Sequence, residues 1–156
     1  MKVRVVIPPL YAAPSTRVED LRPGEVADDG SIYLCQYSGS DWFVTDSDAR
    51  HEDGSPLALT FNEAAAYAKA LTAHDKNDWA LPSLPALHMM LHHHADGAFK
   101  DTYVDNDVNR PGYWTSLKCE GQARSIRFTD RMTAWTRADH KIFVRCVRSV
   151  PRKPMS

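Results

Sequence analysis

The chain has 156 residues, a length that typically forms one domain around a single hydrophobic core. Hydrophobic residues make up 43% and charged residues 25%, which excludes a disordered, collagen-like or coiled-coil protein. Nineteen Lys and Arg residues against twenty Asp and Glu residues give a net charge of -1. This balance leaves no whole-chain electrostatic attraction to nucleic acid or to anionic membranes.

No segment approaches the roughly 18 consecutive apolar residues of a membrane helix, so we expect no membrane insertion. The opening sequence MKVRVVIPP lacks the pattern of a secretory signal, and we expect synthesis in the cytosol. The three cysteines, Cys35, Cys119 and Cys146, have no metal-binding spacing, and their odd number is not that of a disulfide framework. Buried thiols are the simplest interpretation.

Residues 1–27 are predicted to form an extended N-terminal arm. Val3, Val5 and Ile7 alternate with other residues, which predicts one short β-strand. Prolines then interrupt the sequence repeatedly, which is typical of coil. Arms of this kind often dock on another part of a protein or on a partner chain.

A hairpin and a helix are predicted after the arm. Residues 32–37 and 42–45 are rich in β-forming residues on either side of a Ser-Gly-Ser turn, which predicts a β-hairpin. Residues 60–63 have the sequence Thr-Phe-Asn-Glu, a capping box that marks the start of a helix. Apolar residues at helical spacing predict that this helix continues to about His74.

A second helix, a long loop and four strands complete the predicted order. Ser83 is placed to cap the helix, with Pro85 in its first turn. Residues 95–112 are rich in Asp, Asn and Gly and form a longer connection than usual, as functional loops often do. The strands are predicted at residues 113–117, 123–129, 132–137 and 142–150, before a loose tail at 151–156. We therefore expect an α+β fold over residues 28–150, with two helices flanking a mostly antiparallel sheet.

Two polar clusters are candidates for metal binding. His88 and His92 lie four residues apart on the second helix, with His93 and His94 beside them, but a zinc site would need a further ligand from elsewhere. Histidines at a helix C-terminus also suit the helix dipole. Residues 105–109 offer oxygen ligands of the kind that calcium binds, without the glycine and distant glutamate of an EF-hand loop. No motif therefore supports calcium, and we predict no metal and no cofactor.

Motifs for catalysis are missing from the sequence. Ser116 does not lie in a G-x-S-x-G sequence, and none of the three cysteines has the local signature of a catalytic thiol. With seven glycines, none in a nucleotide-binding pattern, the chain has no loop suited to cradle phosphates. We predict that the protein is not an enzyme.

Arginines are concentrated in the last third of the chain. Alternation in the last predicted strand places Arg145 on the face opposite its apolar neighbours, which predicts a solvated or paired side chain. Arginines beside Trp135 and Tyr103 would bind a sulfated or carboxylated sugar through bidentate hydrogen bonds and ring stacking. Ordinary surface packing of arginine on aromatic rings is the alternative interpretation.

Taken together, five sequence strings resemble the Lcl C-terminal domain family, which is named for a Legionella collagen-like adhesin. These strings are LTFNEAAAYA (59–68), DWALPS (78–83), GYWTS (112–116), RFTD (127–130) and VRCVR (144–148). The opening sequence DGSIY (29–33) also resembles family members, so the resemblance covers about residues 28–149. The resemblance rests on the order and spacing of the strings, since no single string is specific to the family.

The resemblance implies a C-type-lectin-like fold, with ligand sites in the long loop region and on the adjacent strands. Members are generally binding modules displayed on cell surfaces or encoded by phages, and some bind sulfated polysaccharides. Ala80 and Ala86 stand where the family commonly has arginine and glutamate, and the calcium-dependent sugar motifs of true C-type lectins are absent. On this basis the candidate ligand-binding residues are Tyr103, Asn109, Trp114, Trp135, Arg137 and His140. The fold also implies a candidate disulfide between Cys119 and Cys146, which a cytosolic location would leave reduced.

We therefore expect a non-enzymatic recognition or decoration module of a phage or prophage virion, which would leave the host by lysis. Residues 1–27 would attach it to other copies or to virion proteins, and a host-surface polysaccharide or a partner chain would be its ligand. The alternative is a bacterial protein-binding module or adhesin with a structural role. The protein would lie on the virion surface if a phage encodes it, and otherwise in the cytoplasm. An enzyme resembling the formylglycine-generating oxidases, which share the lectin-like fold, would need reactive cysteines.

Overall fold

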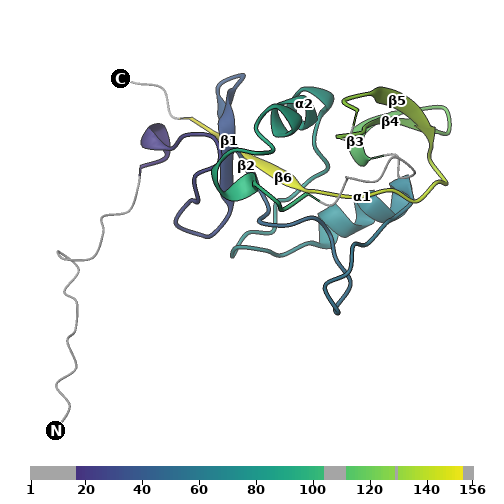
Figure 1. The fold of residues 1–156 in the computed structure, drawn as a ribbon, viewed down its shortest axis with the longest axis horizontal. Coiled ribbons are helices and arrows are strands. Elements are labelled where there is room, and N and C mark those ends of the chain that lie inside the picture. Colours follow the sequence, from purple (N-terminus) through teal and green to yellow (C-terminus); the bar gives the residue numbers. More distant parts are fainter. Residues whose placement is uncertain (1–16, 104–111, 129, 153–156) are drawn as a thin grey trace, which may run out of the picture.

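The computed structural model describes residues 17–103, 112–128 and 130–152. Helices and antiparallel strands form separate parts of the described chain, which confirms the predicted α+β class (Figure 1). In chain order the elements are η1 (Val18–Asp20), β1 (Ile32–Tyr37), β2 (Ser40–Val44), α1 (Phe61–Ala70), α2 (Leu84–His92), η2 (Gly97–Phe99), β3 (Tyr113–Cys119), β4 (Gln122–Ile126), β5 (Thr133–Arg137) and β6 (Val147–Pro151).

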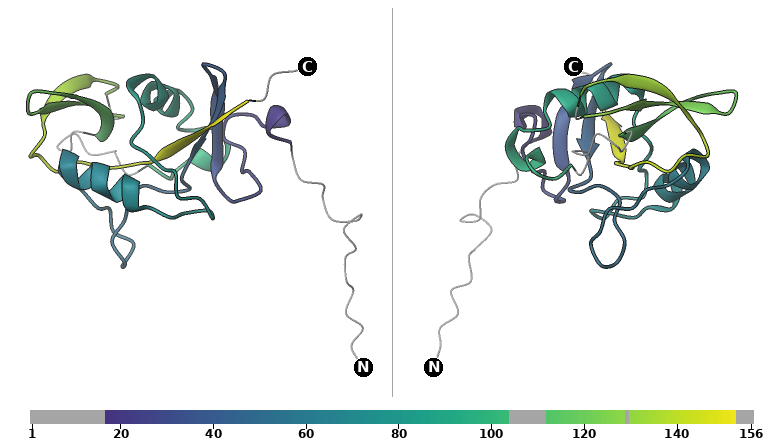
Figure 2. Two further views of the ribbon diagram at one scale, coloured as in Figure 1. Left: turned by 180° about the vertical axis from the view of Figure 1, so that it is seen from behind. Right: turned by 45° about the vertical axis from the view of Figure 1, so that its right-hand side comes forward.

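The strands of the described residues form two antiparallel sheets, where the sequence predicted a single one. One sheet has the order β1-β2-β6 and the other the order β3-β4-β5. The predicted strand at 142–150 is divided, because its first residues cross between the sheets. Ile142 bridges to Leu59 and Phe143 to Tyr113, and only Val147 begins the regular pairing of β6 with β2. The sheets consequently lie at opposite ends of the domain (Figures 1 and 2).

The predicted hairpin is confirmed as β1 and β2. Its turn residues Ser38 and Gly39 both have positive φ, 52° and 77°, as a two-residue hairpin of the primed type requires. This turn twist matches the right-handed twist of the strands, so the short Ser-Gly-Ser sequence suffices to reverse the chain.

Helix α1 begins as predicted and ends earlier than predicted. The Glu63 N–H donates to the Thr60 hydroxyl at 3.3 Å, while the Thr60 N–H donates to the Glu63 carboxylate at 3.0 Å, which completes the capping box. The helix ends at Ala70 and not near His74. The C-cap residue Leu71 has extended backbone, with φ of -71° and ψ of 126°, so the helical conformation stops three residues before His74.

Helix α2 forms as predicted, with the Ser83 hydroxyl accepting from the Ala86 N–H at 3.2 Å and Pro85 in the first turn. Its buried residues Leu87, Met90 and Leu91 belong to a core cluster that also includes residues of β1, β2, β3 and β6. The helix therefore covers one face of β1-β2-β6 and reaches the other sheet.

Residues 17–27, the described part of the predicted arm, pack on the domain. Leu21 is buried against Tyr33 and Phe43, and the Ala98 N–H donates to the Gly24 carbonyl at 2.8 Å. The boundary predicted at residue 27 thus lies inside a packed segment, and the strand predicted at Val3 to Ile7 lies outside the described residues.

The C-terminal boundary predicted at residue 150 also falls within packed structure. Pro151 is the last residue of β6, and Arg152 forms a two-bond ion pair with Asp41 at 3.0 and 2.6 Å. The η1 segment and the end of β6 lie at the same end of the molecule (Figure 2). Both described chain ends therefore leave the domain beside the β1-β2-β6 sheet.

Candidate functional site

Three of the six candidate ligand-binding residues lie close to one another along β5. Trp135 and Arg137 belong to the strand, and the backbone N–H of His140 donates to the Arg137 carbonyl at 3.0 Å in the following turn. In the register of β4 with β5, Arg124 pairs with Trp135 and Gln122 pairs with Arg137. These four paired side chains project from one face, because successive residues of a strand point to opposite faces. We call the surface formed by Gln122, Arg124, Trp135 and Arg137 the Trp135 face.

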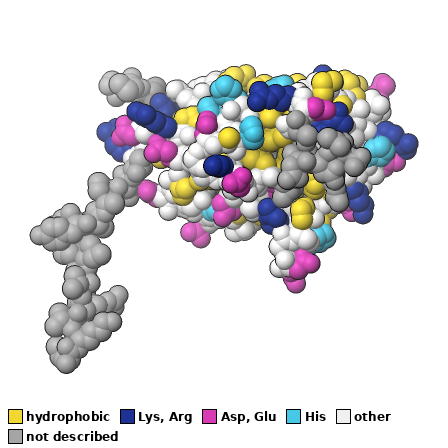
Figure 3. All heavy atoms as spheres, viewed as in Figure 1, with side chains coloured by type: hydrophobic (Ala, Val, Ile, Leu, Met, Phe, Trp, Pro, Cys, Tyr) yellow, Lys and Arg dark blue, Asp and Glu magenta, His cyan; other side chains and the backbone are white. Residues whose placement is uncertain are grey.

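The Trp135 face combines an accessible aromatic ring with guanidinium groups. Trp135 is 42% exposed, and the guanidinium carbon of Arg124 lies 5.0 Å from its ring centroid, within cation–π range. Arg137 forms a 2.9 Å ion pair with Asp139 in which both side chains are largely exposed, so a ligand can displace it at low cost. Figure 3 shows Lys and Arg side chains beside hydrophobic ones at the β3-β4-β5 end of the molecule.

The opposite face of the same strands is buried, which supports the Trp135 face from behind. Ala123 and Ser125 are buried, and the hydroxyl oxygens of Ser125 and Thr136 lie 2.8 Å apart. This hydrogen-bonded layer fixes the strands against the core. A ligand on the outer face would thus meet side chains anchored on a regular sheet rather than on a loop.

Trp114, another candidate ligand-binding residue, is part of the core. Its side chain has no exposed surface, its ring contacts Phe61 edge to face at 5.7 Å, and its indole N–H donates to the Leu59 carbonyl at 2.8 Å. A ligand cannot reach this ring in the described conformation. The strand pattern of residues 113–117 does not reveal this, because both Tyr113 and Trp114 are fully buried and the usual alternation is lost.

Tyr103 lies apart from the Trp135 face, in contact with the main core cluster. Its ring centroid is 4.2 Å from the guanidinium carbon of Arg145 and 4.9 Å from the Phe128 ring. Its hydroxyl is buried and makes no hydrogen bond to the described residues, and burial raises the pKa of this hydroxyl. Asn109, the remaining candidate, lies outside the described residues, as do the oxygen ligands proposed for calcium at 105–109.

Arg145 is buried and paired, in agreement with one of its two predicted states. Its guanidinium is fully buried with the Asp48 carboxylate, 3.1 Å away, and donates twice to the Thr45 carbonyl at 3.0 and 2.7 Å. Its third nitrogen reaches the Thr102 carbonyl and hydroxyl at 3.1 and 2.9 Å. The Tyr113 hydroxyl donates to the other oxygen of Asp48. No sequence pattern links Asp48 to Arg145, because 97 positions separate them.

The candidate disulfide between Cys119 and Cys146 is not formed, and all three cysteines are free. Cys119 is exposed at the end of β3 beside the turn to β4, whereas Cys146 is buried in the cluster that contains Trp79 and Trp114. The expectation was wrong because residues 142–146 leave the terminal sheet to cross to β1-β2-β6.

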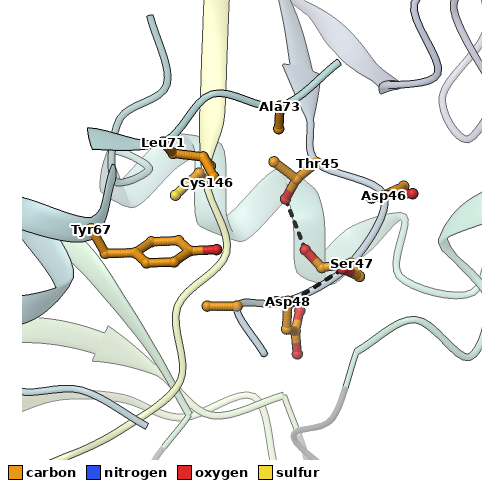
Figure 4. A pocket seen from close by; sticks show the side chains of 9 residues that line it. Thr45, Asp46, Ser47, Asp48, Tyr67, Leu71, Ala73 and Cys146 are labelled. Carbon is orange, nitrogen blue, oxygen red and sulfur yellow. Dashed lines mark hydrogen bonds between the residues drawn. The ribbon is translucent and has the colours of Figure 1, made fainter. Parts of the chain in front are cut away.

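Cys146 lines a small pocket of about 80 Å³ between Tyr67 and the segment 45–48 (Figure 4). Burial raises the pKa of its thiol to about 12, so the thiol is protonated at neutral pH and is a poor nucleophile. Burial also raises the pKa of Tyr67. The pocket has room for a few water molecules.

The histidines at the end of α2 make local contacts. His93 Nδ1 lies 2.8 Å from the Asp96 carboxylate, and His94 Nδ1 donates to the Leu91 carbonyl at 2.7 Å. His92 contacts the His93 ring edge to face. In the described part of the chain no group of three or more His, Cys, Asp or Glu side chains is placed to hold a metal ion.

A second open site is a groove of about 670 Å³ beside η1, on the β1-β2-β6 sheet. Its lining includes Phe43, Val150, Asp41, Arg148 and Arg152. Sequence reasoning did not identify it, because its walls come from four separate parts of the chain.

No protein-family model matches this sequence, and no curated protein matches it at a significant level. In the described ranges no helix is both long and apolar enough to cross a membrane.

Proposed function

We propose that this chain is a non-enzymatic recognition module whose Trp135 face binds an anionic polysaccharide, as a decoration or receptor-binding protein of a phage or prophage particle. The observation that carries the proposal is the exposed Trp135 ring with Arg124 stacked on it and Arg137 in the neighbouring register position. We further propose a C-type-lectin-like fold related to the Lcl C-terminal domain family.

The chemistry of the face supports an anionic sugar. An indole ring stacks on the apolar face of a sugar ring, and guanidinium groups donate paired hydrogen bonds to sulfate or carboxylate groups. Arg124 and Arg137 flank Trp135 on neighbouring strand positions, so one sugar unit can contact the ring while its charged substituent meets an arginine. Because these residues are exposed, we expect modest affinity that decreases as ionic strength rises.

The strings behind the family resemblance also meet in space, which supports a shared architecture. Ala80 bridges to Val147 with hydrogen bonds of 2.8 and 2.9 Å, so the 78–83 and 144–148 strings lie side by side. Asp78 and Arg148 from the same two strings form a two-bond ion pair at 2.7 and 3.2 Å. Hydrogen bonds from Arg148 lower the pKa of Asp78, which keeps it ionised at neutral pH.

The test is binding of the full-length protein to an array of glycans that includes sulfated polysaccharides, in calcium and again in chelator. Trp135→Ala and Arg137→Ala should each weaken binding by about tenfold or more, since both remove a direct contact. Tyr37→Ala and Arg17→Ala are matched controls, because both residues are exposed outside the β3-β4-β5 sheet and should leave binding unchanged. Equal losses from the control variants, or no binding to any glycan, would contradict the proposal. Chelator should have no effect.

The second candidate function is a bacterial protein-binding or adhesin role in which the ligand is another protein. The groove beside η1 favours it, because its apolar floor and charged rim resemble a surface for a polypeptide more than one for a sugar. If the protein binds no glycan and binds another protein through this groove, the second function is favoured.

A further inference from the structure

The two faces of the β1-β2-β6 sheet are covered to different extents. On one face Val44 and Val147 pack in the core cluster with α2. On the other face Leu21, from the segment that includes η1, covers Tyr33 and Phe43. This cover ends before Val150, which is 38% exposed.

The open part of this face forms the floor of the groove. Phe43 pairs with Arg148, and Asp41 pairs with Val150, so all four side chains point to the same face. Each of them lines the groove, together with Leu21 and Pro151. The floor is thus mostly apolar and is bounded by charged side chains.

The charges that remain unpaired at the rim are mainly negative. Arg148 is neutralised by Asp78, and Arg152 by Asp41, through two hydrogen bonds each. Glu19 pairs with Arg17 at 3.3 Å, which leaves Asp28, Asp29 and Lys76 among the charged lining residues. Figure 3 shows acidic and basic side chains next to one another at this end of the molecule. Two acidic groups against one lysine favour a basic occupant.

The chain's own N-terminal residues have the matching chemistry. Residues 1–16 include Lys2 and Arg4 and no acidic residue, and their apolar residues Val3, Val5 and Ile7 alternate along the sequence. An extended segment with this pattern presents apolar side chains on one face and basic ones on the other. These sixteen residues join the described chain next to Val18, which itself lines the groove.

We propose that residues 1–16 of one copy bind in the groove of a second copy, with their apolar residues on Phe43 and Val150 and their basic residues at the acidic rim. Pro8, Pro9 and Pro14 favour extended backbone between this pattern and Arg17, which opposes a tight return into the same copy's groove. The association leaves the Trp135 face of every copy accessible, since the two sheets lie at opposite ends of the domain (Figure 1). Joined copies bind a repetitive polysaccharide with higher avidity than a single copy.

The test is self-association of the full chain by sedimentation velocity over a range of concentrations. The arm variant Val3→Asp/Val5→Asp and the groove variant Val150→Asp should each weaken association about tenfold or more, because each buries a charge in the apolar contact. Met132→Asp is the matched control, since Met132 is a more exposed apolar residue near the other sheet and should have no effect. Asp28→Lys should weaken association and reduce its salt dependence, because it changes an acidic rim residue.

Mixing the arm variant with the groove variant tests whether the contact joins two copies. The arm variant keeps an intact groove and the groove variant keeps an intact arm, so the mixture should associate more strongly than either variant alone. A synthetic peptide of residues 1–16 should also bind the full-length arm variant and not the groove variant.

Three outcomes would overturn the proposal: a wild-type protein that is monomeric at every concentration, an arm variant that associates normally, or a mixture that remains monomeric. Circular dichroism and thermal unfolding of each variant identify any loss that comes from misfolding. Trp135→Ala should leave association unchanged, so failure of the polysaccharide proposal and failure of this one are distinguishable.

Discussion

At the level of single residues, Arg145 is a fully buried charge whose partners lie far away in the sequence. An isolated buried guanidinium is very unfavourable, and it is tolerated here because Asp48 and the oxygens of Thr45 and Thr102 satisfy its hydrogen bonds. The ring of Tyr103 closes one side of the group. The side chain thereby ties the end of β2 to residue 102 and to the chain that crosses between the sheets.

Replacing Arg145 with Met should destabilise the protein by about 3–5 kcal/mol, because it removes the buried ion pair with Asp48 and the hydrogen-bond donors to the oxygens of Thr45 and Thr102. Arg148→Met is the matched control. Asp78 is 54% exposed, so the loss of that pair should cost at most about 1 kcal/mol. Urea unfolding at neutral pH gives both values. Similar losses for the two variants would show that the Arg145 network does not stabilise the fold as we infer.

At the level of elements, the features that the sequence predicted correctly are those set by neighbouring residues. A capping box, a serine N-cap and a two-residue turn each involve groups within a few positions of one another. They can therefore be predicted from short stretches of sequence. The end of α1 was mispredicted because Leu71 already has extended backbone, and the turn that follows packs on distant segments. His74 Nδ1 lies 3.2 Å from the Asp29 carbonyl, and its ring contacts Trp79.

The same difference between local and distant contacts explains which candidate ligand-binding residues are exposed and which are buried. Trp135 and Arg137 lie in a regular strand, where alternation assigns them to one face. Trp114 follows Tyr113 at a point where β3 is buried from both sides, so its environment depends on α1 and on residue 59. The division into two sheets is also a nonlocal property, since residues 142–146 could pair with either sheet as far as their sequence shows.

Removing the α1 cap should have a small and measurable effect. Thr60→Ala removes the acceptor for the Glu63 N–H and should cost about 1 kcal/mol in urea unfolding at pH 7. Thr72→Ala is the control, because Thr72 is exposed beyond the end of the helix and should change stability by less than about 0.5 kcal/mol. Equal losses of stability in Thr60→Ala and Thr72→Ala would show that the loss is not due to the cap hydrogen bond.

The capping box also makes a pH-dependent contribution. The hydrogen bond from the Thr60 backbone N–H lowers the pKa of Glu63 below its ordinary value of 4.5. Folding therefore favours the ionised carboxylate, and its stabilisation is present above pH 4.5 and is lost as the pH falls through the lower folded-state pKa. Any stability difference between wild type and Glu63→Gln should accordingly shrink between pH 5 and about pH 3.

At the level of the whole molecule, the two proposed binding surfaces belong to different sheets. The Trp135 face belongs to β3-β4-β5, and the groove beside η1 belongs to β1-β2-β6, where both described chain ends lie. In this arrangement the proposed contact between copies would not block the proposed ligand-binding face. Residues 17–27 pack on the domain through Leu21 and Gly24, so the predicted boundary at residue 27 divides a packed segment.

Two N-terminal deletions should locate this boundary. Deleting residues 1–16 keeps Leu21, Gly24 and Glu25 with their packing and hydrogen bonds, so at concentrations too low for self-association we expect a melting temperature close to that of the full chain. Deleting residues 1–27 removes the buried Leu21 and the hydrogen bonds that Gly24 and Glu25 make with Tyr33, which should cost about 3 kcal/mol or roughly 10 °C. Leu21→Ala in the full chain should reproduce more than half of that loss, because the Leu21 contact is apolar. Equal melting temperatures for the two deletions would place the domain boundary after residue 27, as the sequence alone suggested.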